Sequence, residues 1–399
     1  MNVLKRLAGG VATCALLMLG ACGGGGGGGG GGIGGSGAPV GSGTMKVSMT
    51  DAPSCGYDAV YVTVDKVRVH QGSDAADGAS GWVDIPLARP QRVDLLTLTN
   101  GVLFPLGETP LPAGTYRQMR LVLADNTQAA PLANSVKPTG GAETPLDTPS
   151  AQQSGLKLNM NVDVPAGQVV DVVLDFDACK SVVRRGNSGR YNLKPVITVI
   201  PVVNSGGQRV EGWVDLRAAG SGTLVSLQSQ GVPVKASIPD SLGRFVLFPV
   251  PAGSYDLVVS APNRATAVLT GVPVAATTVT SVGSSSVRIT APASLSMRTV
   301  SGTVSPATAT VRALQGLTGG PVVEVASPPV DALDGSFAMS LPVAAPVRAP
   351  YVANAPAFGF AADAAVAGLY TVQANSNGNV QSAGINANVP VPPLSFALP

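Results

Sequence analysis

The chain has 399 residues, of which 45% are hydrophobic and only 12% are charged, with a formal net charge of +2. This length predicts two or three domains, and the near-neutral charge argues against the basic face that nucleic-acid binding requires. The 50 glycines and 33 prolines disfavour helices, because these two residues are the poorest helix formers. Short runs rich in valine and threonine, separated by turn residues, instead predict an all-β fold of tandem β-sandwich domains.

Residues 1–21 have the organisation of a secretory signal peptide. Lys5 and Arg6 form a positive region, and the apolar stretch that ends at Leu19 is shorter than the roughly 20 residues that span a bilayer. The sequence Leu-Gly-Ala-Cys that ends at Cys22 resembles a bacterial lipobox. This resemblance implies lipoprotein processing, with cleavage before Cys22, acylation of that residue and anchoring in the outer membrane, on either face. An ordinary signal peptide followed by a chance cysteine is the alternative.

Residues 22–43 are dominated by glycine, including an unbroken run from Gly23 to Gly32. Such a segment cannot bury apolar surface, so we expect a flexible tether with a root-mean-square span of roughly 25 Å. A phosphate-binding loop would need a preceding strand, a following helix and a Lys-Ser/Thr pair, which this segment lacks.

The cysteines indicate one disulfide. Cys14 leaves with the signal peptide and Cys22 is the lipidation site, so Cys55 and Cys179 remain for pairing in a compartment where disulfides persist. Two free buried thiols are the alternative. The chain has no CxxC motif, which argues against a zinc site or a thioredoxin-like site.

Residues 44–203 have the pattern of a first β-rich domain. Val60, Val62 and Val64 alternate with polar residues, and the phase then slips, so we expect a β-bulge near Lys66. Alternation over 156–164 and 170–176 predicts two strands, each with one face on the core and one face in water. A hairpin turn at Pro165-Ala166-Gly167 is expected to join these strands. The stretch 124–155 carries little pattern and is expected to be a surface excursion.

Several blocks of this domain resemble a bacterial lipoprotein domain, the domain-of-unknown-function family 4382. They are the Thr-Asp-Ala-Pro signature at 50–53, YDAVYVTVDKVRVH at 57–70, VDLLTLTNG at 93–101, LPAGTYRQMRLVL at 111–123 and FDACKSVVRRGNSGRYNLKPVI at 176–197. The resemblance covers nearly all of 44–203 and implies a β-rich cell-envelope domain. It brings no established activity and no catalytic residues.

Residues 207–290 are similar to a carboxypeptidase regulatory-like domain, which implies a transthyretin-like sandwich with a carbohydrate-binding-like fold. Phe245 and Tyr255 are then expected to be core aromatics beside a Pro-Gly hairpin. Residues 298–399 repeat the opening of this domain at an offset of 90 residues, although a longer insertion separates the later blocks. They are therefore expected to be a degenerate second sandwich.

Nothing in the chain nominates an enzyme, a cofactor or a metal site. The single histidine, His70, ends an alternating strand, and the Gly-Asn-Ser-Gly sequence around Ser188 is expected to be a hairpin tip. Asp171, Asp175 and Asp177 share one face of a strand, where a spacing of about 7 Å between alternate residues is too wide for three direct calcium ligands. The two carboxylates of a hydrolase would be paired in three dimensions, so their separation in the sequence does not reveal them.

The expected function is display of the sandwiches at the cell envelope, with a glycan or an envelope protein as ligand. Trp82 and Trp213 are candidate aromatic contacts, although core packing is the more ordinary role of a tryptophan. Arg184, Arg185 and Arg190 surround the Ser188 hairpin, where attraction to anionic glycans or headgroups competes with a simple solvated loop. A purely structural envelope component and an undetected hydrolase are the alternative functions.

Overall fold

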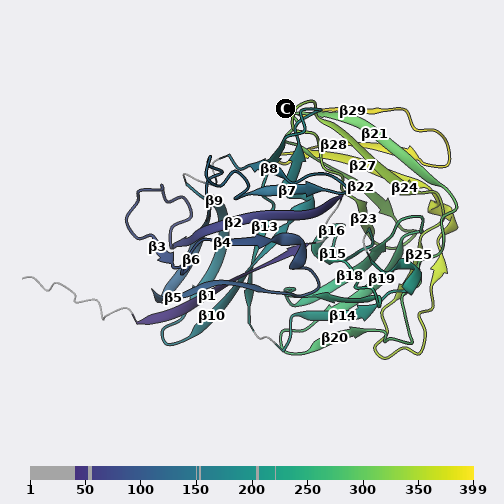
Figure 1. The fold of residues 1–399 in the computed structure, drawn as a ribbon. Helices are drawn as coiled ribbons and strands as arrows, with labels where there is room; N and C mark the ends of the chain where they lie inside the picture. Colours follow the sequence, from purple (N-terminus) through teal and green to yellow (C-terminus); the bar gives the residue numbers. More distant parts are fainter. Residues whose placement is uncertain (1–40, 53–55, 150, 152–153, 204–205, 221) are drawn as a thin grey trace, which may run out of the picture. The chain divides into compact units, whose positions relative to one another are not determined.

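The computed structural model describes residues 41–52, 56–149, 151, 154–203, 206–220 and 222–399. The expected signal peptide, Cys22 and the glycine tether lie outside these residues, apart from the last three residues of the tether. Val40–Pro399 form one unit by their internal contacts. In the described part, strands dominate and helix is limited to one four-residue helix and three 3-10 turns, so the all-β prediction is confirmed (Figure 1).

The first sandwich packs a four-stranded sheet, in the order β13-β10-β1-β5, against a larger sheet in the order β11-β12-β8-β7-β2-β6-β9. Strands β3 and β4 both pair with β2 at the side of this larger sheet. The elements are β1 (Ser42–Ala52), β2 (Tyr57–His70), β3 (Val83–Ile85), β4 (Gln91–Asp94), η1 (Leu95–Thr97), β5 (Phe104–Pro112), β6 (Gly114–Leu123), β7 (Ser135–Pro138), β8 (Thr144–Asp147), β9 (Leu156–Val164), β10 (Val169–Asp177), α1 (Ala178–Ser181), β11 (Val182–Arg184), β12 (Tyr191–Leu193) and β13 (Ile197–Val202).

The phase slip in β2 is a β-bulge, as predicted. The pairing register between β2 and β6 shifts between Val64 and Lys66. Val64 before the shift and Val67 after it are both fully buried in the core of this sandwich. The extra residue therefore keeps valines of both phases on the inner face of one long strand.

The expected hairpin at Pro165-Ala166-Gly167 is wrong. The two flanking strands belong to different sheets: β9 pairs with β6, whereas β10 pairs in parallel with β1 and antiparallel with β13. Gly167 does adopt the left-handed conformation that the turn chemistry requires, with φ +72°. The turn therefore reverses the chain between the two layers of the sandwich, and local turn chemistry did not reveal which strands pair.

The stretch 124–155 is also not a surface excursion. It contains β7 and β8, which extend the larger sheet from β2. Val136 and Leu146 on these strands are fully buried. Asn134 is completely buried as well, and its side chain accepts a hydrogen bond from the backbone of Thr63 and donates one to the carbonyl of Ala124. Hydrogen bonds of the Asn134 side chain thus tie this stretch to the sheet, although its sequence lacks the alternation of a regular strand.

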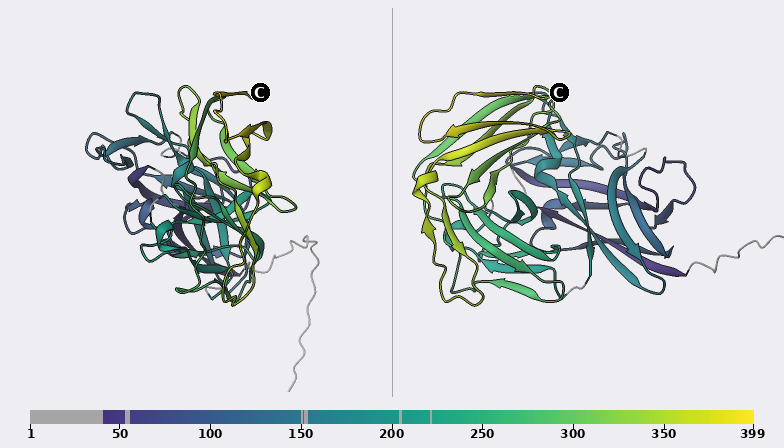
Figure 2. Two further views of the ribbon diagram at one scale, coloured as in Figure 1. Left: turned by 90° about the vertical axis from the view of Figure 1, so that its right-hand side faces the viewer. Right: turned by 180° about the vertical axis from the view of Figure 1, so that it is seen from behind.

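The second and third sandwiches have the same strand order. The second pairs β17-β14-β20 in one sheet and β16-β15-β18-β19 in the other, and the third pairs β24-β21-β29 and β23-β22-β27-β28 (Figure 2 shows them from two further sides). The second sandwich comprises β14 (Arg209–Trp213), η2 (Leu216–Ala218), β15 (Leu224–Ser229), β16 (Val232–Ser237), β17 (Arg244–Leu247), β18 (Gly253–Ser260), β19 (Ala267–Val274) and β20 (Val279–Val282). The third comprises β21 (Met297–Ser305), β22 (Thr310–Gly316), β23 (Val322–Ala326), β24 (Ser336–Pro342), η3 (Ala364–Val366), β27 (Leu369–Ser376), β28 (Asn379–Asn386) and β29 (Leu394–Ala397).

The two copies share a glycine–phenylalanine contact. A Cβ atom at Gly212 of β14 would lie 2.4 Å from Cζ of Phe245 on β17, and one at Gly302 of β21 would lie 2.7 Å from Cζ of Phe337 on β24. Both phenylalanines are buried. Glycine in the first strand of each copy therefore lets the aromatic ring of the neighbouring strand lie directly on the backbone.

The predicted role of Tyr255 is only partly right. Phe245 is fully buried, but Tyr255 is half-buried and packs at the margin of the core, with its hydroxyl donating to the carbonyl of Pro251 at 2.9 Å. The turn before Tyr255 again connects two sheets, from β17 to β18, and is not a hairpin.

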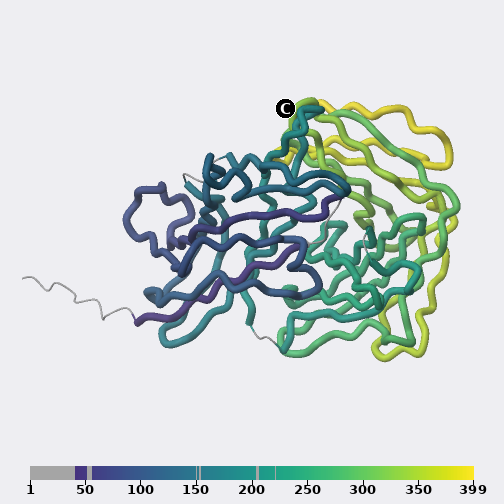
Figure 3. Tube along the Cα trace, viewed as in Figure 1, coloured from purple at the N-terminus to yellow at the C-terminus, as the bar shows by residue number. Residues whose placement is uncertain are grey.

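The insertion in the third copy belongs structurally to the second. The segment between β24 and β27 forms β25 (Val347–Pro350) and β26 (Ala361–Ala362). Strand β25 pairs in parallel with β19 and so extends the second sandwich (Figure 3). The insertion that lengthens the third copy therefore adds strands to a sheet of the second sandwich.

Candidate functional site

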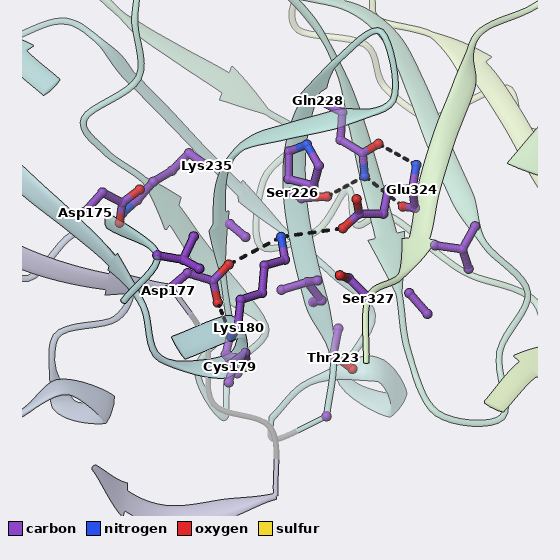
Figure 4. A pocket seen from close by; sticks show the side chains of 18 of the residues that line it. Asp175, Asp177, Cys179, Lys180, Thr223, Ser226, Gln228, Lys235, Glu324 and Ser327 are labelled. Atoms are coloured by element: carbon purple, nitrogen blue, oxygen red, sulfur yellow. Dashed lines mark hydrogen bonds and ion pairs between the residues drawn. The ribbon is translucent and has the colours of Figure 1, made fainter. Parts of the chain in front are cut away.

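A cavity of about 590 Å³ is lined by residues of all three sandwiches. Its walls come from β10 and α1 of the first sandwich, from β15 and β16 of the second, and from β23 of the third. This volume is in the range of ordinary small-ligand sites. Figure 4 shows the polar side chains that face it.

The end of the polar face of β10, at Asp175 and Asp177, forms part of this cavity, whereas the prediction places the whole face in water. Asp171 is exposed, but Asp175 is only 8% exposed. Lys235 of β16 covers this face, and its Nζ lies 2.5 Å from an Asp175 carboxylate oxygen. Contact between sandwiches therefore buries a face whose alternation pattern is typical of solvent exposure.

Burial dominates the electrostatics of Asp175. It raises the pKa of this carboxyl above its ordinary range, and the attraction of Lys235 only partly opposes the effect. A neighbouring carboxylate, Asp177, acts in the same direction as burial.

Lys180 lies between two carboxylates from different sandwiches. Asp177 caps the N-terminus of α1 by accepting from the backbone N–H of Lys180, and its other oxygen lies 3.4 Å from Lys180 Nζ. Glu324 of β23 approaches Nζ from the opposite side at 3.6 Å (Figure 4). Burial acts to lower the pKa of Lys180, but these two carboxylates outweigh it and raise that pKa. Burial likewise raises the pKa of Glu324, despite the opposing charges of Lys180 and Arg312.

Each carboxylate in the cavity wall has a basic partner. Asp175 pairs with Lys235, Asp177 and Glu324 share Lys180, Glu324 also approaches Arg312 at 3.8 Å, and Asp58 at the rim lies 3.5 Å from Lys137. The remaining wall mixes hydroxyl groups with aliphatic side chains: Thr198, Thr223, Ser226, Ser327, Leu224, Val234, Ile238 and Val325. The cavity is therefore charge-balanced, polar at some points and apolar at others.

The candidate tryptophans lie neither in this cavity nor together. Trp82 is partly buried on the first sandwich, with the guanidinium groups of Arg68 and Arg120 at 5.1 and 5.5 Å from its ring centre. Trp213 of β14 is partly buried under Arg288 at 5.2 Å. Both rings are thus covered by a cationic side chain and lie outside the interior positions expected of core tryptophans.

The Ser188 hairpin forms as predicted, because β11 and β12 pair antiparallel around it. Arg185 and Arg190 both bind the carboxylate of Asp147, at 3.0 and 2.8 Å. The side chain of Arg184 is exposed, while its carbonyl accepts from the backbone of Ala332 in the third sandwich. Two of the three candidate arginines are therefore engaged within the protein.

Cys179 is disulfide-bonded and lines the cavity beside Lys180. Its expected partner, Cys55, and the expected lipidation site, Cys22, lie outside the described residues. Across the part of the chain that the structure describes, no group of three or more His, Cys, Asp or Glu side chains is arranged to hold a metal ion. Over the same residues, no helix has the length and apolar character to cross a bilayer.

Comparison with protein families gives one match. Residues 42–195 match the family model described as a domain of unknown function (DUF4382). The DUF4382 region ends before β13, so it contains Asp175, Asp177 and Lys180 but not Lys235 or Glu324. The cavity is therefore built by the DUF4382 region together with the two sandwiches that follow it.

Comparison with solved structures gives a weaker likeness. One similar chain comes from the crystal structure of a complex described as Coh3ScaB-XDoc_M2ScaA, a C-terminal interface mutant of a type II cohesin-X-dockerin complex from Acetivibrio cellulolyticus. The identity is 23% and the TM-score 0.19, and the match covers 22% of this chain and 59% of the other. No curated protein matches the chain.

The cavity residues were only partly accessible to sequence reasoning. The sequence points to the acidic face of β10, but it gives no signal for Lys235, Gln228 or Glu324. These three lie on short strands whose alternation predicts ordinary surface positions, and no spacing within one strand signals a partner in another sandwich.

Proposed function

We propose that the protein is a lipid-anchored, non-catalytic component of the cell envelope that binds a neutral glycan in the cavity between its sandwiches. The observation that carries this proposal is the position of Lys180 between Asp177 and Glu324 in a charge-balanced cavity. A neutral ligand fits such a wall because it leaves every ion pair compensated, whereas a charged ligand would bring an uncompensated charge into a partly buried site.

The distances between Lys180 and its two carboxylate partners suit the hydroxyl groups of a sugar. Its two ion-pair distances of 3.4 and 3.6 Å exceed the roughly 2.7–2.9 Å of a charge-assisted hydrogen bond. A sugar hydroxyl can accept from the ammonium and donate to a carboxylate at once, so it improves the hydrogen bonding of both. The aliphatic side chains of Leu224, Val234 and Val325 offer surface for the apolar face of a sugar ring.

A binding role is favoured over hydrolysis by the pairing of the carboxylates. Glycoside hydrolysis uses one carboxyl as an acid and another as a nucleophile or base on opposite sides of the bond that breaks. Asp177 and Glu324 lie on either side of the same Lys180 ammonium, so a cation fills the space where the bond that breaks would have to lie.

The sequence at the N-terminus supports the anchoring part of the proposal. Acyl chains on Cys22 would hold the protein in the outer membrane, since two or more chains give stable anchoring where one is marginal. The glycine-rich tether would then let the sandwiches reach a few tens of ångströms from the membrane surface. In this oxidising compartment we assign Cys55 as the partner of Cys179.

Two measurements test these parts separately. Cys22→Ser should move the protein from the membrane fraction to the soluble periplasmic fraction, and persistence in the membrane would refute the anchor. The soluble Cys22→Ser chain should bind neutral oligosaccharides on a glycan array. An array without a signal would leave the sandwiches as a structural component of the envelope and would refute the binding role.

A further inference from the structure

Lys235 and Asp175 form a contact between the first and second sandwiches that differs from the other ion pairs. Their side chains are 1% and 9% exposed, and Nζ lies 2.5 Å from the carboxylate oxygen. In each other ion pair among the described residues, at least one side chain is 22% exposed or more. Both charges of this pair are therefore withdrawn from water.

Both side chains are held in place by sheet structure. Asp175 lies on β10, which pairs with a strand on each side, and its register partners are Thr50 of β1 and Thr198 of β13. Lys235 lies on β16, opposite Leu227 of β15. Two strands, each paired in its own sheet, thus hold the Lys235 amine and the Asp175 carboxyl next to each other. Figure 4 shows these two side chains pointing toward one another.

An ion pair in this position is costly, because desolvation of two charges offsets most of their attraction. Amide formation starts from the uncharged form of such a pair, an amine and a carboxylic acid, and therefore requires one proton to move from nitrogen to oxygen. Burial raises the pKa of the Asp175 carboxyl, which is the direction that this transfer requires.

We propose that Lys235 and Asp175 condense to an intramolecular amide that covalently joins the first sandwich to the second. The lone pair of the neutral Nζ forms a bond to Cγ of Asp175, and the Cγ–OH bond then breaks. One proton from Nζ leaves with this hydroxyl as water, so an amine and a carboxylic acid become one amide and one water molecule. No oxidant, nucleotide or other co-reactant enters the balance.

Two features of the site assist this step. Both reacting residues line the 590 Å³ cavity, which gives the released water an exit. Fixed proximity also lowers the barrier, because well-oriented intramolecular reactions reach effective concentrations of about 10⁵–10⁸ M.

Peptide mapping of the full, mature chain tests the bond directly. After reduction, alkylation and tryptic digestion, unmodified protein gives the separate peptides 158–180 and 218–235. The amide prevents cleavage after Lys235, so the predicted product is a branched species in which 158–180 is joined to 218–244, lighter by one water than the sum of the two. Full recovery of linear 218–235 would overturn the proposal and leave a simple ion pair.

The chain contains a matched control for this experiment. Lys180 and Asp177 are 3.4 Å apart and partly exposed, so they should not condense, and cleavage after Lys180 should stay complete. Lys235→Arg keeps the positive charge but lacks the amine, so its intact mass should equal the mass calculated for the processed, acylated and disulfide-bonded chain, while the wild-type mass should be one water below its own calculated value. Equal deficits in both proteins would place the water loss elsewhere and refute the assignment.

Discussion

The side-chain amide of Gln228 pairs with both backbone groups of Glu324. Its Nε2 donates to the Glu324 carbonyl at 2.8 Å, and its Oε1 accepts from the Glu324 N–H at 2.7 Å. Glu324 lies on β23, an edge strand of the third sandwich, and Gln228 lies on β15 of the second. One carboxamide thus satisfies an open strand edge, as a neighbouring strand would, and holds the Glu324 side chain at the cavity.

Replacing Gln228 should loosen this junction. Gln228→Ala removes three hydrogen bonds, including one to Ser226, and leaves the backbone groups of Glu324 without these partners. An unpaired buried polar group costs about 1–3 kcal/mol, so we expect a loss of about 2–3 kcal/mol in unfolding free energy, measured by denaturant titration. Gln168→Ala, at an exposed turn, is the control and should change little. Equal stability of both variants would contradict the role of Gln228.

The glycine–phenylalanine contact of the second sandwich should also be sensitive. In Gly212→Ala the new methyl group would meet the Phe245 ring at 2.4 Å and the Val282 carbonyl oxygen at 2.7 Å. Overpacking of this kind costs about 1–3 kcal/mol, which exceeds the usual benefit of alanine over glycine in a strand. Gly384→Ala is a suitable control, because a Cβ atom there meets nothing within 4 Å. A melting temperature for Gly212→Ala at or above that of the wild type would refute the contact.

The raised pKa of Glu324 predicts a specific pH dependence of the unfolding free energy. Burial raises the pKa of this carboxyl in the folded chain, so between its unfolded pKa and that raised pKa the folded state binds more protons than the unfolded state. The contribution of Glu324 to stability is therefore present in acid and is lost as pH rises through this window. Glu324→Gln removes the titration, so its unfolding free energy minus that of the wild type should increase from pH 4 upward. A difference that is flat or falls with pH would contradict the direction of the shift.

The mature protein should contain no free thiol. Cys179 is disulfide-bonded, and we assign Cys55 as its partner. Alkylation of the folded protein without reductant should modify neither residue, whereas reduction should expose both. Loss of this bridge should cost about 4–5 kcal/mol in the chain-entropy model, because the closed loop exceeds 100 residues. Labelling of either cysteine before reduction would refute the pairing.

Local patterns in the sequence predicted local structure well. The phase slip after Val64 marked a β-bulge, and the alternation over 156–164 marked a strand with one buried face, because each follows from side-chain periodicity within a single strand. The all-β class followed from composition. The Val-x-Gly-x-Val block that occurs at 210–214 and again at 300–304 likewise indicates two related sandwiches, and these share their strand order.

The candidate site was beyond such reasoning, because it depends on contacts between sandwiches. The turn at Pro165-Ala166-Gly167 has the same residue chemistry whether it joins paired strands or crosses between layers. Asp175 alternates with apolar residues as a solvent-facing residue does, and only the approach of Lys235 from another sandwich buries it. Glu324 likewise becomes part of the site only because it lies beside Lys180, which is 144 positions earlier in the chain.

The central claim is that the sandwiches together form a binding site for a neutral glycan at Lys180 and Glu324. The most direct measurement is a calorimetric titration of the Cys22→Ser protein with the oligosaccharide that gives the strongest array signal, repeated with Glu324→Gln and with Glu108→Gln, an exposed glutamate outside the cavity wall. We predict at least a tenfold weaker affinity for Glu324→Gln, about 1.4 kcal/mol, and unchanged affinity for Glu108→Gln. Equal affinity in all three proteins, or the absence of any bound oligosaccharide, would contradict the claim.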